Sequence, residues 1–125
     1  MTQTSDSPYD ALERIFHEPS RLSIMSAVCA ADKGITFSEL KKECGLTDGN
    51  LNRHLKVLAD AGAIKIDKAF VDGKPRTTIS ISEKGLDQFN KYLAALSEVL
   101  KEAKRAIPVE KKEKGVVIDG KAVRA

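Results

Sequence analysis

Apolar residues between positions 36 and 64 recur at the spacing of two short helices that meet at a tight turn. Thr36 is followed three residues later by Glu39, a capping-box pattern in which each side chain accepts from the other residue's backbone amide. This pair predicts the start of the first helix. Gly45 predicts its end, because glycine readily adopts the positive φ that closes a helix. The pattern therefore predicts a helix-turn-helix.

The second helix of this pair is expected to start at Thr47 or Asp48. Its apolar residues recur at helical spacing and predict a buried face, formed by Leu51, Leu55 and Leu58. The opposite face is polar and comprises Asp48, Gly49, Asn50, Asn52, Arg53 and Lys56. A short face of amide, guanidinium and ammonium groups suits a helix that lies in the major groove of DNA, where such groups reach base edges and phosphates.

The segments before this pair also show helical patterns. A short helix is predicted over Tyr9–Phe16, with an apolar stripe of Leu12, Ile15 and Phe16. This stripe needs a packing partner, which in a dimer could be the other subunit. Pro19 suits the first turn of the next helix, because its missing amide costs nothing there. That largely apolar helix is expected to end near Gly34, and Ile35 predicts a very short strand.

A β-hairpin is predicted after the second helix of the pair. Ile64, Ile66 and Phe70 alternate with polar or small residues, which predicts a strand with one buried face. Asp72-Gly73 is typical of a type I′ turn, because both central residues of that turn need positive φ. The return strand is expected to direct Thr77, Ile79 and Ile81 inward.

The last predicted helix begins after Ser82 and carries apolar residues at alternating spacings of three and four. They are Leu86, Phe89, Leu93, Leu96, Leu100 and Ala103. This is the seam of a coiled coil or of two packed helices. About 22 residues of helix would be roughly 33 Å long, more than so small a domain can cover. We expect a second copy to pack on the excess; the alternative is that the helix folds back on its own domain.

In combination, these segments resemble one known family. The matching pieces are Pro19-Ser20-Arg21-Leu22-Ser23-Ile24, Asn52-Arg53-His54-Leu55-Lys56-Val57-Leu58, Ala61-Gly62-Ala63-Ile64 and Ile81-Ser82-Glu83-Lys84-Gly85. The span from about Pro19 to Leu100 resembles a winged helix-turn-helix transcriptional regulator of the MarR/ArsR type. The resemblance implies a mainly α fold with a small β-hairpin wing and a long C-terminal dimerisation helix. It also implies that the basic tip of the wing contacts the DNA backbone or minor groove; the alternative is a solvated turn.

Candidate contact residues follow from side-chain chemistry. The base-edge candidates are Asn50, Asn52 and Arg53, because Asn pairs with adenine and Arg with guanine in the major groove. The phosphate candidates are Thr47, Lys56, Lys74 and Arg76. Gly49 would let the first helical turn approach the backbone closely. The candidate dimer interface comprises Leu12, Phe16, Leu86, Phe89, Leu93, Leu96 and Leu100. Ordinary solvation is the alternative for the polar face.

Composition indicates one globular domain. The chain has 125 residues, 42% hydrophobic and 31% charged. We expect a flexible arm at 1–8, a DNA-binding and dimerisation domain at 9–106 and a basic, mobile tail at 107–125. The net charge is +3, yet residues 36–62 are neutral and residues 63–82 carry +2. The DNA hypothesis therefore rests on pattern more than on charge. No apolar run could span a membrane, so a cytoplasmic protein is expected.

Enzyme chemistry has little support in the sequence. The chain has two histidines, His17 and His54, and lacks a glycine-rich phosphate loop, a nucleophile elbow or a paired acidic motif. His54, at the edge of the buried face, is expected to pack or to bond a phosphate. Cys29 and Cys44 lack metal-ligand spacing and are expected to be buried small hydrophobes, so neither a metal site nor another cofactor is expected, and a redox switch has no support.

The leading hypothesis is a sequence-specific DNA-binding transcriptional regulator that acts as a homodimer on a pseudo-palindromic operator. The alternative is a winged-helix module that binds another protein and no DNA, which the neutral helix-turn-helix keeps open. A small-molecule effector in the dimer interface is a further possibility that the resemblance implies. No residue identifies such a ligand.

Overall fold

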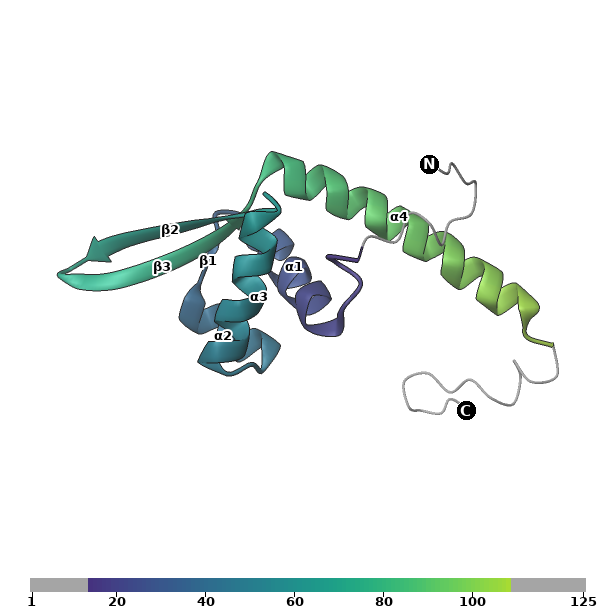
Figure 1. Cartoon of the computed structure of the whole chain (residues 1–125), viewed down its shortest axis with the longest axis horizontal. Helices are drawn as coiled ribbons and strands as arrows, with labels where there is room; N and C mark the ends of the chain where they lie inside the picture. Colours follow the sequence, from purple (N-terminus) through teal and green to yellow (C-terminus); the bar gives the residue numbers. More distant parts are fainter. Residues whose placement is uncertain (1–13, 109–125) are drawn as a thin grey trace.

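Four helices and a three-stranded antiparallel sheet make up the fold. The computed structural model describes residues 14–108. The elements are α1 (Pro19–Ala30), β1 (Ile35–Thr36), α2 (Phe37–Cys44), α3 (Asp48–Asp60), β2 (Ile64–Val71), β3 (Lys74–Ile81) and α4 (Glu83–Ala106). The sheet order is β1-β3-β2. Figure 1 shows α1, α2 and α3 gathered beneath the base of the sheet, with the β2–β3 hairpin and α4 projecting in opposite directions. The mainly α winged-helix architecture predicted from the sequence is confirmed.

Local signals place the helix-turn-helix as predicted. Thr36 Oγ1 accepts from the amide of Glu39, and the Glu39 carboxylate accepts from the amide of Thr36, both at 3.1 Å. Gly45 closes α2 in the left-handed region with φ 64°. Thr47 caps α3, because its hydroxyl oxygen accepts from the amide of Asn50 at 3.2 Å. These polar contacts satisfy helix-end amides and fix the turn between the two helices.

The hairpin formed by β2 and β3, residues 64–81, is called the wing below. Its turn is the predicted one: Asp72 and Gly73 have φ values of 55° and 76°. The predicted burial of Phe70 is wrong, since its side chain is 76% exposed. The alternation continues beyond the last core residues of the wing, Ile66 and Ile79, so within the described part of the chain the outer half of the inward face has no packing partner.

The core is aliphatic at its centre and aromatic at one edge. Its buried residues come from every helix and from the base of the sheet, and include Ile24, Met25, Leu40, Leu51, Leu58 and Ile79. The prediction that both thiols are buried is wrong, because Cys29 is exposed and Cys44 is half-buried. Cys29 follows the buried Val28 on α1 and so lies on another face of that helix.

The N-terminal segment enters the core through a turn. The predicted helix over residues 9–16 lies mostly outside the described residues, and the described part, residues 14–16, forms a turn. Phe16 is fully buried, with its ring centroid 5.3 Å from that of Phe89 and 5.7 Å from that of Tyr92. The prediction that Phe16 belongs to a dimer interface is therefore wrong for this conformation, because its surface is covered by its own chain. Leu12, the arm at 1–8 and residues 109–125 of the predicted tail lie outside the described residues.

Helix α4 divides its predicted single seam between two faces. Phe89, Tyr92 and Ala95 are buried against the protomer, and Leu96 is half-buried. Leu86, Leu93 and Leu100 are 45%, 40% and 53% exposed. The prediction that Phe89 faces a partner is therefore wrong: the three-four spacing spans a stripe wide enough for one edge to pack on the protomer while the other stays open. Among the described residues, no helix is long and apolar enough to cross a membrane.

Candidate nucleic-acid interface

The outward face of α3 is the polar surface that the sequence predicted. Asn50, Asn52, Arg53 and Lys56 are exposed, together with Thr47, Asp48 and Gly49. Leu51, Leu55 and Leu58 are buried on the opposite side. One face of α3 therefore packs against the core, and the other face presents amide, guanidinium and ammonium groups to solvent. This division fixes which side chains can meet a partner.

A buried polar contact ties α3 to α1. His54 is only 4% exposed, and its Nδ1 lies 3.2 Å from Arg21 Nη1, which donates to it. Arg21 Nε donates to the Ile15 carbonyl oxygen at 2.7 Å. Burial lowers the pKa of His54. The negative charge of Glu18 opposes this shift, and the positive charges of Arg53 and Arg21 add to it. The neutral imidazole thus accepts from Arg21, and His54 packs inside the fold instead of meeting a phosphate.

Two candidate base-contacting side chains are held together. Arg53 Nη2 donates to Asn50 Oδ1 at 3.0 Å, one helical turn apart on the exposed face. A guanidinium has five N–H donors, so this contact leaves enough for a bidentate pair with another acceptor. The amide group of Asn50 also keeps its two N–H donors. The pair therefore presents a fixed cluster of donors to solvent.

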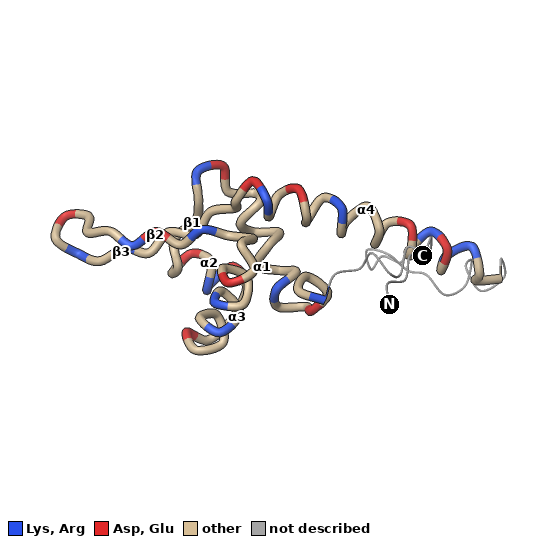
Figure 2. The backbone as a smooth tube through the Cα atoms, turned by 45° about the horizontal axis from the view of Figure 1, so that its top comes forward, with Lys and Arg blue, Asp and Glu red and all other residues tan. Residues whose placement is uncertain are grey.

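Ion pairs near this face are exposed and weak. Lys41 Nζ lies 2.9 Å from Asp48 across the α2–α3 turn, and Lys56 Nζ lies 3.2 Å from Asp60. Exposed pairs of this kind contribute about 0.2–1 kcal/mol each. Neither lysine is therefore locked away from a phosphate. Figure 2 shows charges of both signs interspersed along α3 and the wing, without a continuous basic stripe.

An open groove lies between α3 and the wing, with a volume of about 550 Å³. It is lined by Phe37, Asn52, Leu55, Lys56, Ala59, Asp60, Ile66, Lys68 and Thr77. Lys56 stands on the α3 side and Lys68 on the wing side. Sequence reasoning missed Lys68, although the period-two pattern held the signal: Lys68 lies two residues after Ile66 and so shares its face.

The two predicted wing contacts occupy the other face. Directly paired residues of an antiparallel hairpin share a face, and Val71 pairs with Lys74 while Ala69 pairs with Arg76. The face turned toward α3 instead carries the pairs Lys68–Thr77 and Phe70–Pro75. Arg76 also lies close enough to Glu39 to contribute, after that residue's hydrogen bonds to Thr36, to lowering the pKa of the Glu39 carboxyl. Lys74 and Arg76 are thus on the wing but not in the groove.

Comparison with known proteins identifies the family. Residues 20–100 match the family described as a winged helix DNA-binding domain. An uncharacterized protein of Methanocaldococcus jannaschii is 32% identical over 88 residues, which cover 70% of this chain and 95% of that protein. A transcriptional regulator homologue from Pyrococcus horikoshii OT3 has a similar structure, with a TM-score of 0.70 and 30% identity, covering 76% of this chain and 94% of that one.

A more distant structure shares the fold alone. A MarR-family transcriptional regulator from Rhodococcus sp. RHA1 has a TM-score of 0.61 at 14% identity, and the match covers 86% of this chain and 77% of that one. The resemblance drawn from the sequence is confirmed by these matches. The chain belongs to the winged helix DNA-binding domain family, with the fold of MarR/ArsR-type transcriptional regulators.

Proposed function

We propose that this protein is a sequence-specific DNA-binding transcriptional regulator that acts as a homodimer on a pseudo-palindromic operator. The observation that carries the proposal is the exposed polar face of α3, whose opposite face is packed into the core. A helix fixed in this way can enter a major groove without first breaking contacts with its own chain. Its donors then meet base edges in a defined register.

Roles within the interface follow from position. Arg53 and Asn50 are the base-reading pair, with Asn52 beside them at the edge of the groove. Lys56 and Lys68 stand on opposite sides of that groove and would contact phosphates of a DNA strand that runs between α3 and the wing. Lys74 and Arg76 would contact phosphates from the other face of the wing. Thr47 and Gly49 would let the backbone at the start of α3 approach a phosphate, because helix N-termini favour anions.

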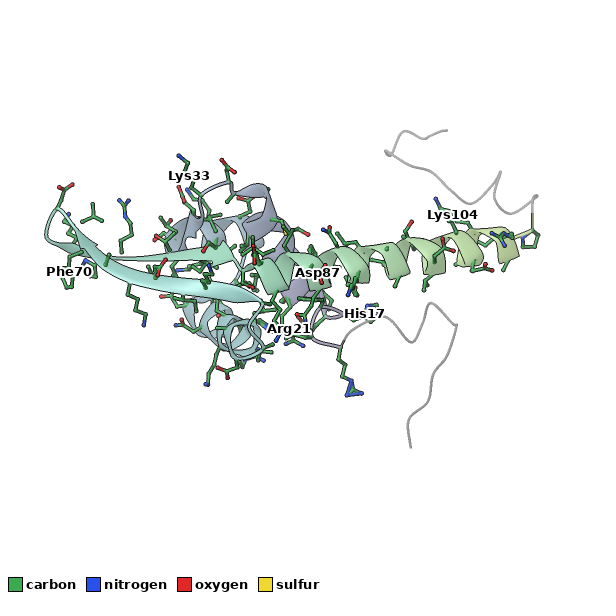
Figure 3. The ribbon with its side chains drawn as sticks, turned by 90° about the horizontal axis from the view of Figure 1, so that it is seen from above. His17, Arg21, Lys33, Phe70, Asp87 and Lys104 are labelled. Atoms are coloured by element: carbon green, nitrogen blue, oxygen red, sulfur yellow. The ribbon has the colours of Figure 1, made fainter. Side chains whose placement is uncertain are left out.

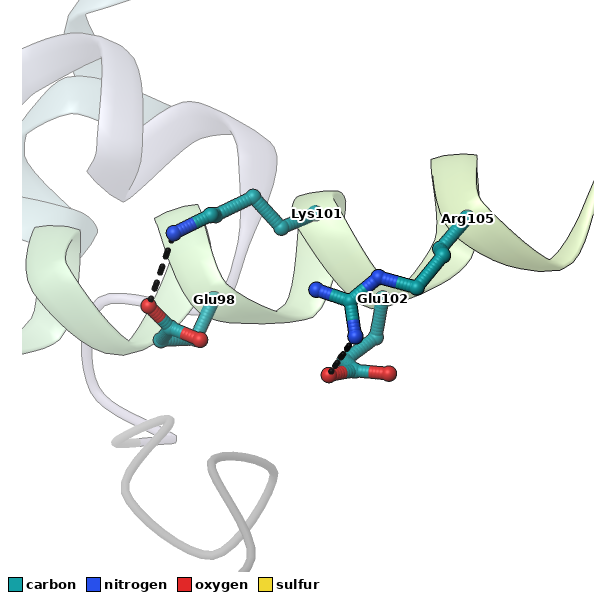
Figure 4. A network of polar contacts seen from close by, with 4 residues as sticks. All are labelled: Glu98, Lys101, Glu102 and Arg105. Atoms are coloured by element: carbon teal, nitrogen blue, oxygen red, sulfur yellow. Dashed lines mark hydrogen bonds and ion pairs between the residues drawn. The ribbon is translucent and has the colours of Figure 1, made fainter.

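Helix α4 supports the homodimer. Leu86, Leu93 and Leu100 are exposed at intervals of seven residues, the repeat of a coiled-coil stripe. Figure 3 shows the part of α4 around Lys104 extending away from the other helices and the sheet. Along that part, two exposed pairs, Glu98–Lys101 at 3.5 Å and Glu102–Arg105 at 3.3 Å, bridge successive turns (Figure 4). Such pairs add only tenths of a kcal/mol each, roughly 0.2–0.5, so a packed second copy gives the projecting helix its stability.

A second copy would also complete the DNA site. The α3 helices of two copies related by a twofold axis can occupy successive major grooves if they lie about 34 Å apart. Half-sites of a pseudo-palindrome then lie about one helical turn apart. The dimer proposal and the operator proposal therefore depend on each other.

The rival function is a winged-helix module that binds a protein. It is favoured by the neutral charge of residues 36–62 and by the exposed apolar Val57 on α3. If the protein is such a module, substitution of Val57 would abolish binding of the partner protein, and substitution of Arg53 would leave that binding unchanged. The DNA proposal requires the reverse.

The test begins with selection of duplex DNA from a random pool, followed by fluorescence anisotropy on the selected sequence. Arg53→Ala should lose about 1–3 kcal/mol of discrimination at one base position. Lys68→Ala should weaken binding to all sequences alike. It should also reduce, by about one, the slope of the logarithm of the binding constant against the logarithm of the salt concentration. Lys104→Ala, near the exposed end of α4, removes the same charge far from the interface and serves as the control.

Failure to select any sequence would refute the proposed function. Selection of a sequence to which Arg53→Ala binds with unchanged specificity would refute the role of α3. If Lys104→Ala weakened binding as much as Lys68→Ala, the effect would come from net charge, and the groove would have no special part.

A further inference from the structure

The outer half of the wing carries an apolar pair that no residue in the described range 14–108 covers. Phe70 is 76% exposed, and Figure 3 shows it near the far end of the hairpin, away from the helices. Its cross-strand partner is Pro75, which is also exposed. The two side chains are therefore open to contact with a partner.

The position of this pair indicates which partner it fits. Phe70 and Pro75 continue the face of the wing that carries Lys68 and Thr77 and lines the groove beside α3. The wing as a whole, residues 64–81, has four basic and two acidic residues. An apolar pair that follows Lys68 on one face of a net basic hairpin complements the minor groove of a DNA duplex, which has stacked apolar bases between two rows of phosphates.

The reach of the wing is sufficient. Phe70 lies six residues beyond Ile64, the buried residue at which β2 begins, which is about 20 Å along an extended strand. With α3 in a major groove, the neighbouring minor groove lies about half a helical turn away, roughly 17 Å. The two-residue turn and the paired strands keep the hairpin stiff over this distance. The end of the turn carries the acidic Asp72, which would be repelled by phosphates, so the wing approaches by its Phe70 face and not by its tip.

We propose that Phe70, backed by Pro75, is an apolar wedge that enters the minor groove beside the site read by α3 and partly unstacks one base step. This proposal rests on the proposed DNA-binding function. A wedge of this kind favours base steps that unstack easily, such as TA and CA, over stiff steps. The wing thereby adds a sequence preference at positions where no side chain contacts a base edge, because base steps differ in how easily they deform.

The experiment compares adjacent residues on opposite faces of the wing. Phe70→Ala removes the wedge, Phe70→Leu keeps an apolar wedge, and Val71→Ala is the control because Val71 pairs with Lys74 on the other face. Affinity is measured on the selected operator with TA, CA or stiff steps at the flanking minor groove. Bending is measured by energy transfer between dyes at the two ends of the same duplexes.

Phe70→Ala should bind about 5- to 100-fold more weakly, bend the duplex less and lose the preference for TA and CA steps. Phe70→Leu and Val71→Ala should stay near the wild type. The proposal is overturned if Phe70→Ala bends and discriminates like the wild type, or if Phe70→Leu or Val71→Ala loses as much. It is also overturned if Phe70→Ala changes the mass of the free protein in sedimentation, since the pair would then serve contact between copies.

Failure of the wedge and failure of DNA binding give different results. If the wild-type protein binds no duplex, the proposed function itself fails. If the wild-type protein binds its operator and Phe70→Ala does so equally well, only the wedge is refuted. Because Phe70 is exposed, the melting temperature of Phe70→Ala should match that of the wild type, which separates loss of binding from loss of fold.

Discussion

The first turn of α4 gives the sharpest stability prediction. Gly85 is buried there, and a Cβ at this position would overlap the backbone carbonyl of Ala63. The same junction is bonded by three contacts: Ser82 N donates to the Ala63 oxygen at 3.2 Å, Ser82 Oγ donates to the Gly62 oxygen at 2.6 Å, and Gly85 N donates to Ser82 Oγ at 2.8 Å. Gly85→Ala must move α4 away from the α3–β2 turn.

The magnitude follows from these contacts. Forcing a methyl group into a packed site costs typically about 1–3 kcal/mol, and here the neighbour is backbone and cannot rotate away. Each strained hydrogen bond adds about 1 kcal/mol, and the gain in helix propensity returns at most about 1 kcal/mol. We expect Gly85→Ala to lower the free energy of unfolding by about 2–4 kcal/mol. That is a large part of the roughly 5–15 kcal/mol typical of a domain.

Gly49→Ala is the matched control, because Gly49 is also helical. Apart from its chain neighbours and the nearby backbone of α3, no heavy atom of the described residues lies within 4 Å of an added Cβ. It should raise the free energy of unfolding by about 0.5–1 kcal/mol through helix propensity. If Gly49 also lets α3 approach DNA closely, the same variant should bind the operator more weakly. Urea unfolding followed by circular dichroism, at one fixed protein concentration, measures both variants. A Gly85→Ala protein as stable as the wild type would refute the packing described for α4.

Three further predictions concern the core, the dimer and pH. Phe16→Ala should lower the free energy of unfolding by about 3–5 kcal/mol in urea titrations, because Phe16 is fully buried; a cost below 1 kcal/mol would mean that the N-terminal turn does not pack as described. Leu93→Asp should produce monomers in sedimentation, whereas Lys91→Asp beside it should leave dimers; an unchanged Leu93→Asp dimer would place the interface elsewhere. Burial lowers the pKa of His54 in the folded state, so the unfolded state takes up the proton first and stability should fall as pH drops below the ordinary value of 6.5. His54→Asn keeps an acceptor for Arg21 but cannot titrate, so its unfolding free energy between pH 7 and 5 should be flatter; an identical slope would assign the effect to other groups.

Features set by neighbouring residues were predictable from the sequence. The Thr36–Glu39 capping box, the positive φ of Gly45 and the Asp72-Gly73 turn each depend on a few adjacent residues whose chemistry is visible in the sequence. The exposed face of α3 was also predictable, because its apolar residues recur with the helical period. Local pattern therefore gave the elements and most of the candidate DNA-contacting face.

Features set by contacts across the fold were not predictable in the same way. The period-two pattern of β2 could not show that the core covers this strand only as far as Ile66, so that Phe70 is left in solvent. The spacing on α4 could not show that Phe89 meets Phe16 while Leu93 stays open. Tyr92, between the predicted seam positions, gave no signal that it would complete the aromatic cluster. In each case the missing information is which surface lies opposite the residue.

Gly85 illustrates the same limit at a single position. In sequence it is one glycine near the start of a helix, where it lowers helix propensity and gives no sign of a special role. In the structure the backbone of α4 passes so close to Ala63 that a side chain has no room. Close approach of two backbones is a property of tertiary packing, so it is visible only in the folded structure.

The affinity of the purified wild-type protein for its selected duplex, compared with a scrambled duplex of equal length and composition, tests the central claim most directly. Both are measured by anisotropy at one stated salt concentration, with the number of chains per duplex determined by sedimentation. We predict binding at least about a thousandfold tighter to the selected duplex, with two chains bound. Equal affinity for both duplexes, or one chain per duplex, would contradict the account.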